Sequence, residues 1–157
     1  MQTPARSVRT VITRDELETR ALGAALASVA IAGDVLCLSG ELGAGKTQLA
    51  KGFGAGLGVE DAIQSPSFIL MAEHRGRLPM FHIDLYRLGD PAEAIEDGLL
   101  DDRESAGVTL VEWAERLGDA RPASRLDVRI DVLPDESRLV ALSPADARHA
   151  RYLAVVR

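Results

Sequence analysis

The chain has 157 residues, of which 46% are hydrophobic and 27% charged, and its formal net charge is −6. This length fits one domain with a single core, and the composition is too hydrophobic for a disordered chain. No apolar run approaches the length of about 18 residues that a membrane helix needs, and the N-terminus lacks the pattern of a secretory signal. The single cysteine, Cys37, excludes an internal disulfide. We therefore expect one cytoplasmic domain over residues 1–157 with no membrane segment.

The first third of the chain alternates between strand and helix patterns. Thr13 and Glu16 form the spacing of a capping box at the start of the first helix. The apolar run Val35–Leu38 is typical of a strand buried on both faces of a parallel sheet. In chain order, the pattern predicts a strand over 7–13, a helix over 15–31, a strand over 35–38 and a helix over 46–57.

The remainder of the chain continues the same alternation and ends in a predicted hairpin. Its patterns predict strands over 68–73 and 78–85, a helix over 90–100, a strand over 108–113, a short helix over 114–117, and a hairpin of 126–133 with 139–142. Ser143 and Pro144 are expected to cap a C-terminal segment. No repeat or linker interrupts this order, so we expect an α/β fold.

A phosphate-binding motif lies between the second strand and the second helix. Residues 40–47 read GELGAGKT and match G-x-x-x-x-G-K-[ST]. In such a loop the backbone N–H groups turn toward phosphate, the lysine reaches the β- and γ-phosphates, and the hydroxyl binds Mg²⁺. The alternative is a glycine-rich connection with a solvated lysine, although lysine occurs only at positions 46 and 51 beside 16 arginines. The predicted nucleotide-binding residues are Leu42, Gly43, Ala44, Gly45, Lys46 and Thr47.

The scarcity of lysine also helps to predict which nucleotide base the site binds. Guanine-specific switch proteins carry an N/T-K-x-D element, and neither Lys46 nor Lys51 stands in one. Adenine is therefore favoured by elimination.

Two carboxylates follow apolar strands and are candidate metal ligands. Asp84 follows residues 80–83, and Glu112 follows residues 108–111. Ligands of α/β sheets bind at the carboxyl ends of the strands, and Mg²⁺ needs only one or two carboxylates. Either residue could instead be a surface acid at a strand exit. The predicted metal ligands are thus Thr47, Asp84 and Glu112, and Lys46, Asp84 and Glu112 are the predicted catalytic residues.

Other residues allow two interpretations. Ser65 and Ser67 could sense the γ-phosphate as part of a switch segment, but a proline-defined turn with a capping serine is favoured by the residues alone. His82 is expected to be a hydrogen-bonded packing residue rather than a proton-transfer group. Arg87 could approach the phosphates or be solvated. Arginines near the C-terminus are expected mainly on a solvated helix face: Arg148, Arg151 and Arg157.

Taken together, these segments resemble the TsaE family, the small ATPases of bacterial tRNA threonylcarbamoyladenosine biosynthesis. The resemblance covers most of the chain, and its order and spacing agree. HIDLYRL followed by VEW is its most specific part, because the phosphate loop alone would be generic. It rests on GELGAGKT at 40–47, SPSFIL at 65–70, HIDLYRL at 82–88 and VEW at 111–113.

The resemblance implies a P-loop NTPase-like three-layer sandwich with a central, mostly parallel sheet and a C-terminal β-hairpin. It implies an ATPase that uses ATP/ADP and Mg²⁺ and acts with TsaB and TsaD on tRNAs that decode ANN codons. Lys46 and Thr47 would hold phosphate and metal, while Asp84 and Glu112 would complete the metal shell or orient water. Ser67 stands where the family commonly has threonine.

Two other functions stay open. A small-molecule P-loop kinase would need a substrate segment and a basic lid, and no arginine-dense insertion is seen between the strands. A nucleotide-switched interaction module would bind partners differently with ATP and ADP while turning over negligibly. From the resemblance to the TsaE family, we expect slow ATP hydrolysis by the isolated chain and faster hydrolysis with its partners.

Overall fold

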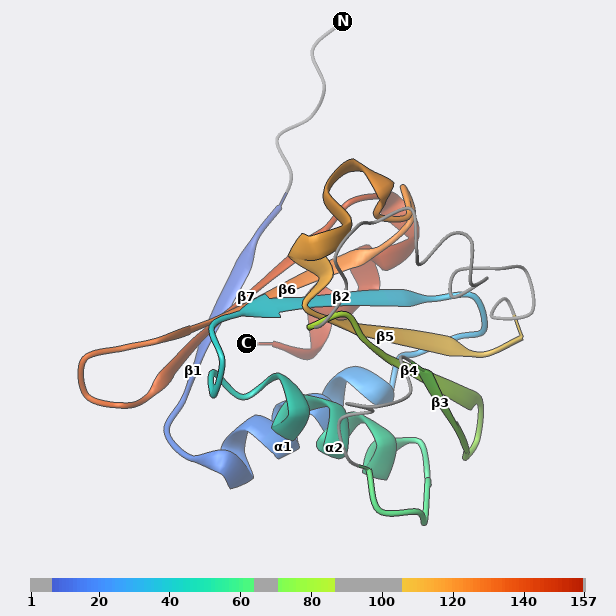
Figure 1. Cartoon of the computed structure of the whole chain (residues 1–157), viewed down its shortest axis with the longest axis horizontal. Coiled ribbons are helices and arrows are strands. Elements are labelled where there is room, and N and C mark those ends of the chain that lie inside the picture. Colours follow the sequence, from blue (N-terminus) through green and yellow to red (C-terminus); the bar gives the residue numbers. More distant parts are fainter. Residues whose placement is uncertain (1–6, 64–70, 87–105, 157) are drawn as a thin grey trace, which may run out of the picture.

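The computed structural model describes residues 7–63, 71–86 and 106–156. The described residues form a seven-stranded sheet in the order β1-β7-β6-β2-β5-β4-β3, with α1 and α2 together on one side of it (Figure 1). The strands are β1 (Arg9–Thr13), β2 (Val35–Gly40), β3 (Met71–Arg75), β4 (Pro79–Asp84), β5 (Val108–Glu112), β6 (Leu126–Val132) and β7 (Arg138–Pro144). The helices are α1 (Glu16–Ala27), α2 (Lys46–Gly56) and the 3₁₀ helices η2 (Ala114–Ala120) and η3 (Ala147–Val155).

The strands are parallel in the centre of the sheet and antiparallel at its edges. β6, β2, β5 and β4 run parallel to one another. β7 pairs antiparallel with both β6 and β1, and β3 pairs antiparallel with β4. The mostly parallel sheet and the C-terminal hairpin predicted from the sequence are therefore confirmed.

The two faces of the sheet carry separate cores, because successive side chains of a strand point to opposite faces. Leu36 and Leu38 of β2 pack into the larger core beneath α1 and α2. Cys37, between them, faces the smaller core beneath η2. Burial raises the pKa of the Cys37 thiol to about 12, which makes it an inert packing group, as expected. The sheet thus forms the middle layer of a three-layer fold.

The start of α1 differs from the predicted capping box by two residues. Asp15 is the N-cap, and its carboxylate accepts a hydrogen bond of 2.8 Å from the Glu18 backbone N–H. Thr13 instead ends β1, where its hydroxyl lies 2.7 Å from the Thr19 hydroxyl in the interior. An aspartate competes well with threonine for a helix N-terminus, which accounts for the shift.

Glycines let α1 and α2 pack closely. A Cβ on Gly23 of α1 would lie 2.2 Å from the Leu49 carbonyl oxygen, and one on Gly52 of α2 would lie 1.9 Å from the Arg20 carbonyl oxygen. The helix backbones therefore touch where these residues lack side chains. This contact fixes α2, and with it the phosphate loop, against the rest of the fold.

Several predicted boundaries move. The first helix ends at Ala27 rather than at residue 31. Ser143 and Pro144 belong to β7, and Asp146 caps η3 through a bond from the His149 backbone N–H. The predicted helix over 90–100 and residues 68–70 of a predicted strand lie outside the described residues. Within residues 7–63, 71–86 and 106–156, no helix is long and apolar enough to cross a membrane.

Candidate functional site

The phosphate loop and the two predicted carboxylates meet at one edge of the sheet. Gly40, Asp84 and Glu112 are the last residues of β2, β4 and β5. Because these strands are parallel, their carboxyl ends lie on the same edge. The register places Glu112 beside both Leu38 and Asp84. The structure therefore brings these predicted residues together at one edge of the sheet.

The loop holds a backbone shape that only glycine adopts readily. Gly43 and Gly45 have φ angles of +81° and +115°, in the left-handed region. Gly45 is the N-cap of α2 and supplies no side-chain cap, so the helix N-terminus opens into the loop. Gly43 is exposed, and a Cβ on it would meet no atom within 4 Å, so this part of the loop borders open space. An uncapped helix N-terminus behind an open turn is a suitable anion cradle.

The Lys46 side chain is folded back onto the loop. Its Nζ donates hydrogen bonds of 2.5 and 2.9 Å to the carbonyl oxygens of Gly40 and Glu41. The same nitrogen lies 3.9 Å from the ring centroid of Trp113. Burial lowers the pKa of the Lys46 ammonium, and the carboxylates of Glu115, Glu112 and Asp84 oppose that effect. A bound phosphate would therefore compete with the carbonyls of Gly40 and Glu41 for the Lys46 ammonium.

Glu112 joins the loop to the neighbouring strand. Its Oε1 accepts a 2.9 Å hydrogen bond from the Thr47 hydroxyl, and its Oε2 lies 2.5 Å from Nε2 of His82. Glu112 is 2% exposed and His82 is fully buried. His82 is thus the hydrogen-bonded packing residue that the sequence predicted. Nδ1 of the same imidazole is buried without a hydrogen-bond partner among the described residues.

Asp84 lies next to this pair. It is 7% exposed, and its Oδ1 accepts a 2.9 Å bond from the Tyr86 backbone N–H. In the parallel register the side chains of Asp84 and Glu112 share one face of the sheet. Thr47, Glu112 and Asp84 thus supply oxygen donors at one edge, which suits Mg²⁺. The described residues hold no group of three His, Cys, Asp or Glu that forms a metal site by itself.

Three residues at the loop were not singled out as site residues by sequence reasoning. Trp113 lies under Lys46 and takes a left-handed conformation with φ +60°. Glu115 accepts a 3.2 Å bond from the Gly40 N–H. Arg138, 94 residues from Ala44, donates a 2.9 Å bond to the Ala44 carbonyl. No local motif marks Arg138, because its partner lies far away in the sequence.

Pockets lined by described residues lie beside the phosphate loop and beside α2. One, of about 240 Å³, lies between the loop, the start of α1 and the β6–β7 turn. It is lined by Arg14, Asp15, Glu16, Thr19, Gly43, Ala44, Gly45, Gln48, Glu136 and Arg138.

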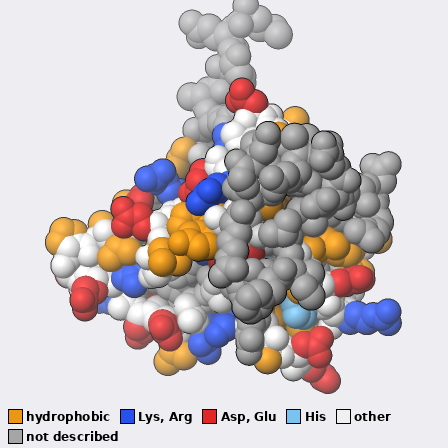
Figure 2. All heavy atoms as spheres, viewed as in Figure 1, with side chains coloured by type: hydrophobic (Ala, Val, Ile, Leu, Met, Phe, Trp, Pro, Cys, Tyr) orange, Lys and Arg blue, Asp and Glu red, His pale blue; other side chains and the backbone are white. Residues whose placement is uncertain are grey.

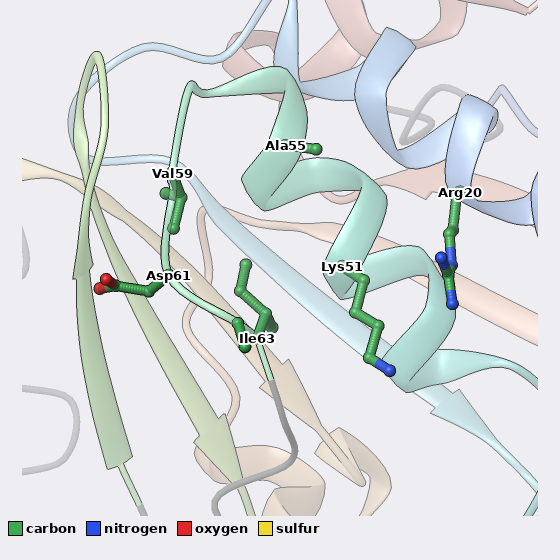
Figure 3. Close-up of a pocket in the computed structure, with 7 residues that line it drawn as sticks. Arg20, Lys51, Ala55, Val59, Asp61 and Ile63 are labelled. Carbon is green, nitrogen blue, oxygen red and sulfur yellow. The ribbon is translucent and has the colours of Figure 1, made fainter.

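The other pocket, of about 280 Å³, is shown in Figure 3. Arg20 of α1 and Lys51 of α2 line it on one side, and Asp61 lines it from the segment after α2, with its carboxylate turned toward β3 (Figure 3). None of the predicted site residues that the structure describes lines this second pocket, so Lys51 serves as a reference lysine outside the described part of the site.

The solvated face predicted for the C-terminal arginines is found in part: the Arg148 side chain is 44% exposed and that of Arg151 is 27% exposed, but both also bind an interior acid. Arg148 and Arg151 bind the carboxylate of Asp34, which is fully buried. Predicted residues that lie outside the described part of the chain are Ser65, Ser67, Arg87 and Arg157.

Comparisons with known proteins agree on one family. The family model described as threonylcarbamoyl adenosine biosynthesis protein TsaE matches residues 13–140. A tRNA threonylcarbamoyladenosine biosynthesis protein TsaE of Bacillus subtilis is 39% identical over 133 residues, which cover 84% of this chain and 83% of that protein. The protein of the same name from Streptomyces coelicolor is 44% identical over 115 residues, covering 71% of this chain and 78% of that protein.

A solved structure gives the same result. The crystal structure of Bacillus subtilis YdiB superposes with a TM-score of 0.81 and 32% sequence identity, covering 97% of this chain and 95% of that one. The likeness therefore spans the whole α/β fold and is not limited to the phosphate loop.

Proposed function

The chain belongs to the TsaE family, and on that premise we propose that it binds ATP with Mg²⁺ and hydrolyses it slowly in support of tRNA threonylcarbamoyladenosine biosynthesis. The observation that carries the proposal is the 2.9 Å hydrogen bond between Thr47, at the end of the phosphate loop, and Glu112, 65 residues later. This contact joins a phosphate cradle to a carboxylate at one sheet edge, as phosphoryl transfer requires.

The residues divide the work by position. Backbone N–H groups at the start of α2 would hold the phosphates, and Lys46 would leave the Gly40 and Glu41 carbonyls to bind the same anion. The Thr47 hydroxyl and the Asp84 carboxylate would hold the metal. When bound, Mg²⁺ neutralises charge on the β- and γ-phosphates. Glu112, fixed by His82, would complete the metal shell or orient the attacking water through a hydrogen bond.

The pocket of about 240 Å³ offers a place for the nucleoside. It opens on the side of the loop toward β6 and β7, whereas Asp84 and Glu112 lie on the side toward β4 and β5. A nucleotide bound through the loop would then place its terminal phosphate by the carboxylates and its base by the β6–β7 turn. The absence of an N/T-K-x-D element supports adenine as that base.

We extend the proposal to partners. Family membership supports action together with TsaB and TsaD, with tRNA reached through the complex and threonylcarbamoyl transfer performed by TsaD. Leu42 in the loop is 75% exposed, and Tyr86, two residues after Asp84, is 43% exposed. Figure 2 shows a group of hydrophobic side chains on the viewed face. Apolar side chains beside a nucleotide site suit a protein partner that responds to its state.

ATP turnover by the purified chain tests this function. We expect slow turnover alone, a rise when TsaB, TsaD and tRNA are added, and loss of turnover in Lys46→Ala. Lys51→Ala is the matched control, because Lys51 lines the separate pocket of Figure 3 and should turn over as the wild type does. Fast turnover that ignores the partners, or phosphate transfer to a small acceptor, would favour a kinase instead.

A nucleotide-switched module without required hydrolysis is the second candidate. It is favoured by one observation: the Lys46 ammonium is bonded to the carbonyls of Gly40 and Glu41 in this structure, so nucleotide binding must release the Lys46 side chain. Partner affinity measured with ADP and with a non-hydrolysable ATP analogue separates the two. A strong difference in affinity with no effect of blocked hydrolysis on tRNA modification would select the switch.

A further inference from the structure

A single arginine connects the β6–β7 hairpin to the phosphate loop, where it also lines the pocket of about 240 Å³. Arg138 begins β7 and pairs with Thr13 of β1 and Val132 of β6. Its Nε donates a 2.9 Å hydrogen bond to the Ala44 carbonyl, and its Nη2 donates a 3.3 Å bond to the Gly43 carbonyl. Two consecutive carbonyls of the loop are therefore held by one planar guanidinium.

The geometry of the peptide bond converts this contact into an orientation of N–H groups. The described residues contain no cis peptide, and in a planar trans peptide the C=O and the following N–H point in opposite directions. With the Ala44 carbonyl turned toward Arg138, the Gly45 N–H must point away from Arg138. The preceding peptide is held in the same way, and its Ala44 N–H closes the turn by a 3.0 Å bond to the Glu41 carbonyl.

The guanidinium also keeps its charge available. Its partners are the carbonyl oxygens of Gly43, Ala44 and Glu136, all of them neutral. Within the described part of the chain, no carboxylate lies at ion-pair distance from Arg138. Arg129 of β6, by contrast, is paired with Asp131 at 3.1 Å on the surface. A cation held by neutral partners beside an anion site adds to the positive potential there.

We infer that Arg138 is a positioning residue of the phosphate loop. It presets the Gly43–Ala44 and Ala44–Gly45 peptide planes so that the Gly45 N–H faces the phosphates before nucleotide arrives. The inference rests on the proposed nucleotide site and adds a residue that no motif assigns to it. A backbone that already has its bound conformation lowers the entropic cost of binding nucleotide.

This role makes a specific kinetic prediction. The backbone groups that Arg138 presets serve the ground state and the transition state alike, so losing them weakens binding without slowing the bound complex. ADP and ATP should lose affinity equally, because the γ-phosphate is not involved. An arginine that acted on the reacting phosphate would instead lower kcat and leave ADP affinity unchanged.

The experiment compares Arg138→Lys, Arg138→Met and the control Arg129→Met. Lysine keeps the charge but cannot hold two carbonyls in one plane, so both Arg138 variants should bind ADP and ATP about tenfold more weakly. Their kcat at saturating ATP should stay within about twofold of the wild-type value. Arg129→Met removes the same charge from the same hairpin and should bind as the wild type does. Affinity is measured by calorimetry, and circular dichroism verifies folding.

A second readout needs no nucleotide. In ¹⁵N spectra of the free protein, the amide signals of Ala44 and Gly45 should move in both Arg138 variants and stay in place in Arg129→Met. Unchanged ADP affinity in both Arg138 variants, or wild-type affinity in Arg138→Lys, would overturn the positioning role of Arg138 while leaving the proposed nucleotide site intact. A wild-type chain that binds neither ADP nor ATP would overturn the proposed function and, with it, the positioning role of Arg138.

Discussion

A carboxylate is buried at each end of the central parallel strands, and the two carboxylates have different kinds of partner. Asp34 precedes β2 and is fully buried, while Glu112 ends β5 and is 2% exposed. Two charges that cost so much to remove from water need partners. The partners differ in kind, and this difference separates a structural site from a functional one.

Asp34 is surrounded by cations and donors that the chain itself supplies. Arg151 binds its Oδ2, Arg148 lies 3.3 Å from its Oδ1, and the Tyr152 hydroxyl donates a 2.5 Å bond. The Ile31 N–H donates a further bond of 3.0 Å. This carboxylate is already neutralised, so it fastens η3 to the turn before β2 and has no charge left for a ligand.

Glu112 has two hydrogen-bond partners, the Thr47 hydroxyl and the His82 imidazole. No arginine or lysine forms an ion pair with it among the described residues. The nearest candidate, Lys46, bonds the loop carbonyls instead. A buried carboxylate that has an imidazole but no arginine or lysine as its described partner can still accept a cation from outside, which fits Mg²⁺ with a nucleotide.

The largest expected effect is on stability. Asp34→Ala should lower the free energy of unfolding by about 3 kcal/mol, because two guanidiniums and a tyrosine hydroxyl lose their common acceptor. Urea denaturation measures it, and nucleotide affinity of the folded fraction should not change. Asp131→Ala breaks the exposed pair with Arg129 and should cost less than about 1 kcal/mol. If Asp34→Ala and Asp131→Ala lowered the free energy of unfolding equally, Asp34 would not be the structural site described above.

Glu112→Gln should give the converse result. Turnover of ATP should fall about 10²-fold, because the oriented charge is removed while Gln can still accept from Thr47. The free energy of unfolding should hold or rise, since burying an amide costs less than burying a carboxylate without a cation. Steady-state kinetics and urea denaturation test the two halves. Destabilisation as large as that of Asp34→Ala would show that Glu112 is structural.

His82 should have an intermediate effect that acts through Glu112. His82→Ala should raise the Mg²⁺ concentration for half-maximal turnover about tenfold, because the carboxylate loses the group that fixes its orientation. His82→Gln retains an amide donor and should recover part of the loss. If His82→Ala lowers stability but leaves the Mg²⁺ dependence unchanged, His82 only packs the core.

The smallest expected effect is a pH dependence at the Asp34 end. His149 Nε2 accepts a 3.1 Å bond from the Val35 N–H, and Nδ1 lies 2.7 Å from Asp146 Oδ1. Burial lowers the pKa of the His149 imidazole, and the Asp146 carboxylate partly opposes this. The unfolded chain therefore takes up the proton first, so stability is complete above about pH 6.5 and declines as the pH falls below it.

The measurement is urea denaturation at several pH values for the wild type and His149→Gln. The variant should be less stable at neutral pH but should lose less stability on acidification. Parallel pH curves for the two proteins would remove His149 as the source. The Asp146 carboxylate, whose own pKa is lowered, titrates at more acidic pH and does not enter this window.

The comparison also separates what sequence patterns predict well from what they predict poorly. The loop at 40–47, the apolar strand ahead of it and the acids at 84 and 112 are local patterns, and each was found where the sequence predicted it. The helix cap at Thr13 was wrong, because Asp15 competes for the same helix end. Such errors of one or two residues leave the architecture unchanged.

Arginine was the residue that sequence reasoning interpreted least well. Arg148 and Arg151 read as solvated cations, yet both bind Asp34, more than a hundred residues away. Arg138 carried no signal at all. Long cationic side chains look alike in a sequence, and their partners depend on which strands the sheet brings together.

The sequence by itself determined the α/β order, the phosphate loop and the identity of the candidate metal ligands, because each depends on side chains close together in the chain. The tertiary structure decided which charges meet. The pairing of β7 with β6 and β1 brings Arg138 to the phosphate loop, and the packing of η3 brings two arginines to Asp34. Those contacts join residues 94 to 117 positions apart, and only sheet register and helix packing can set such distances.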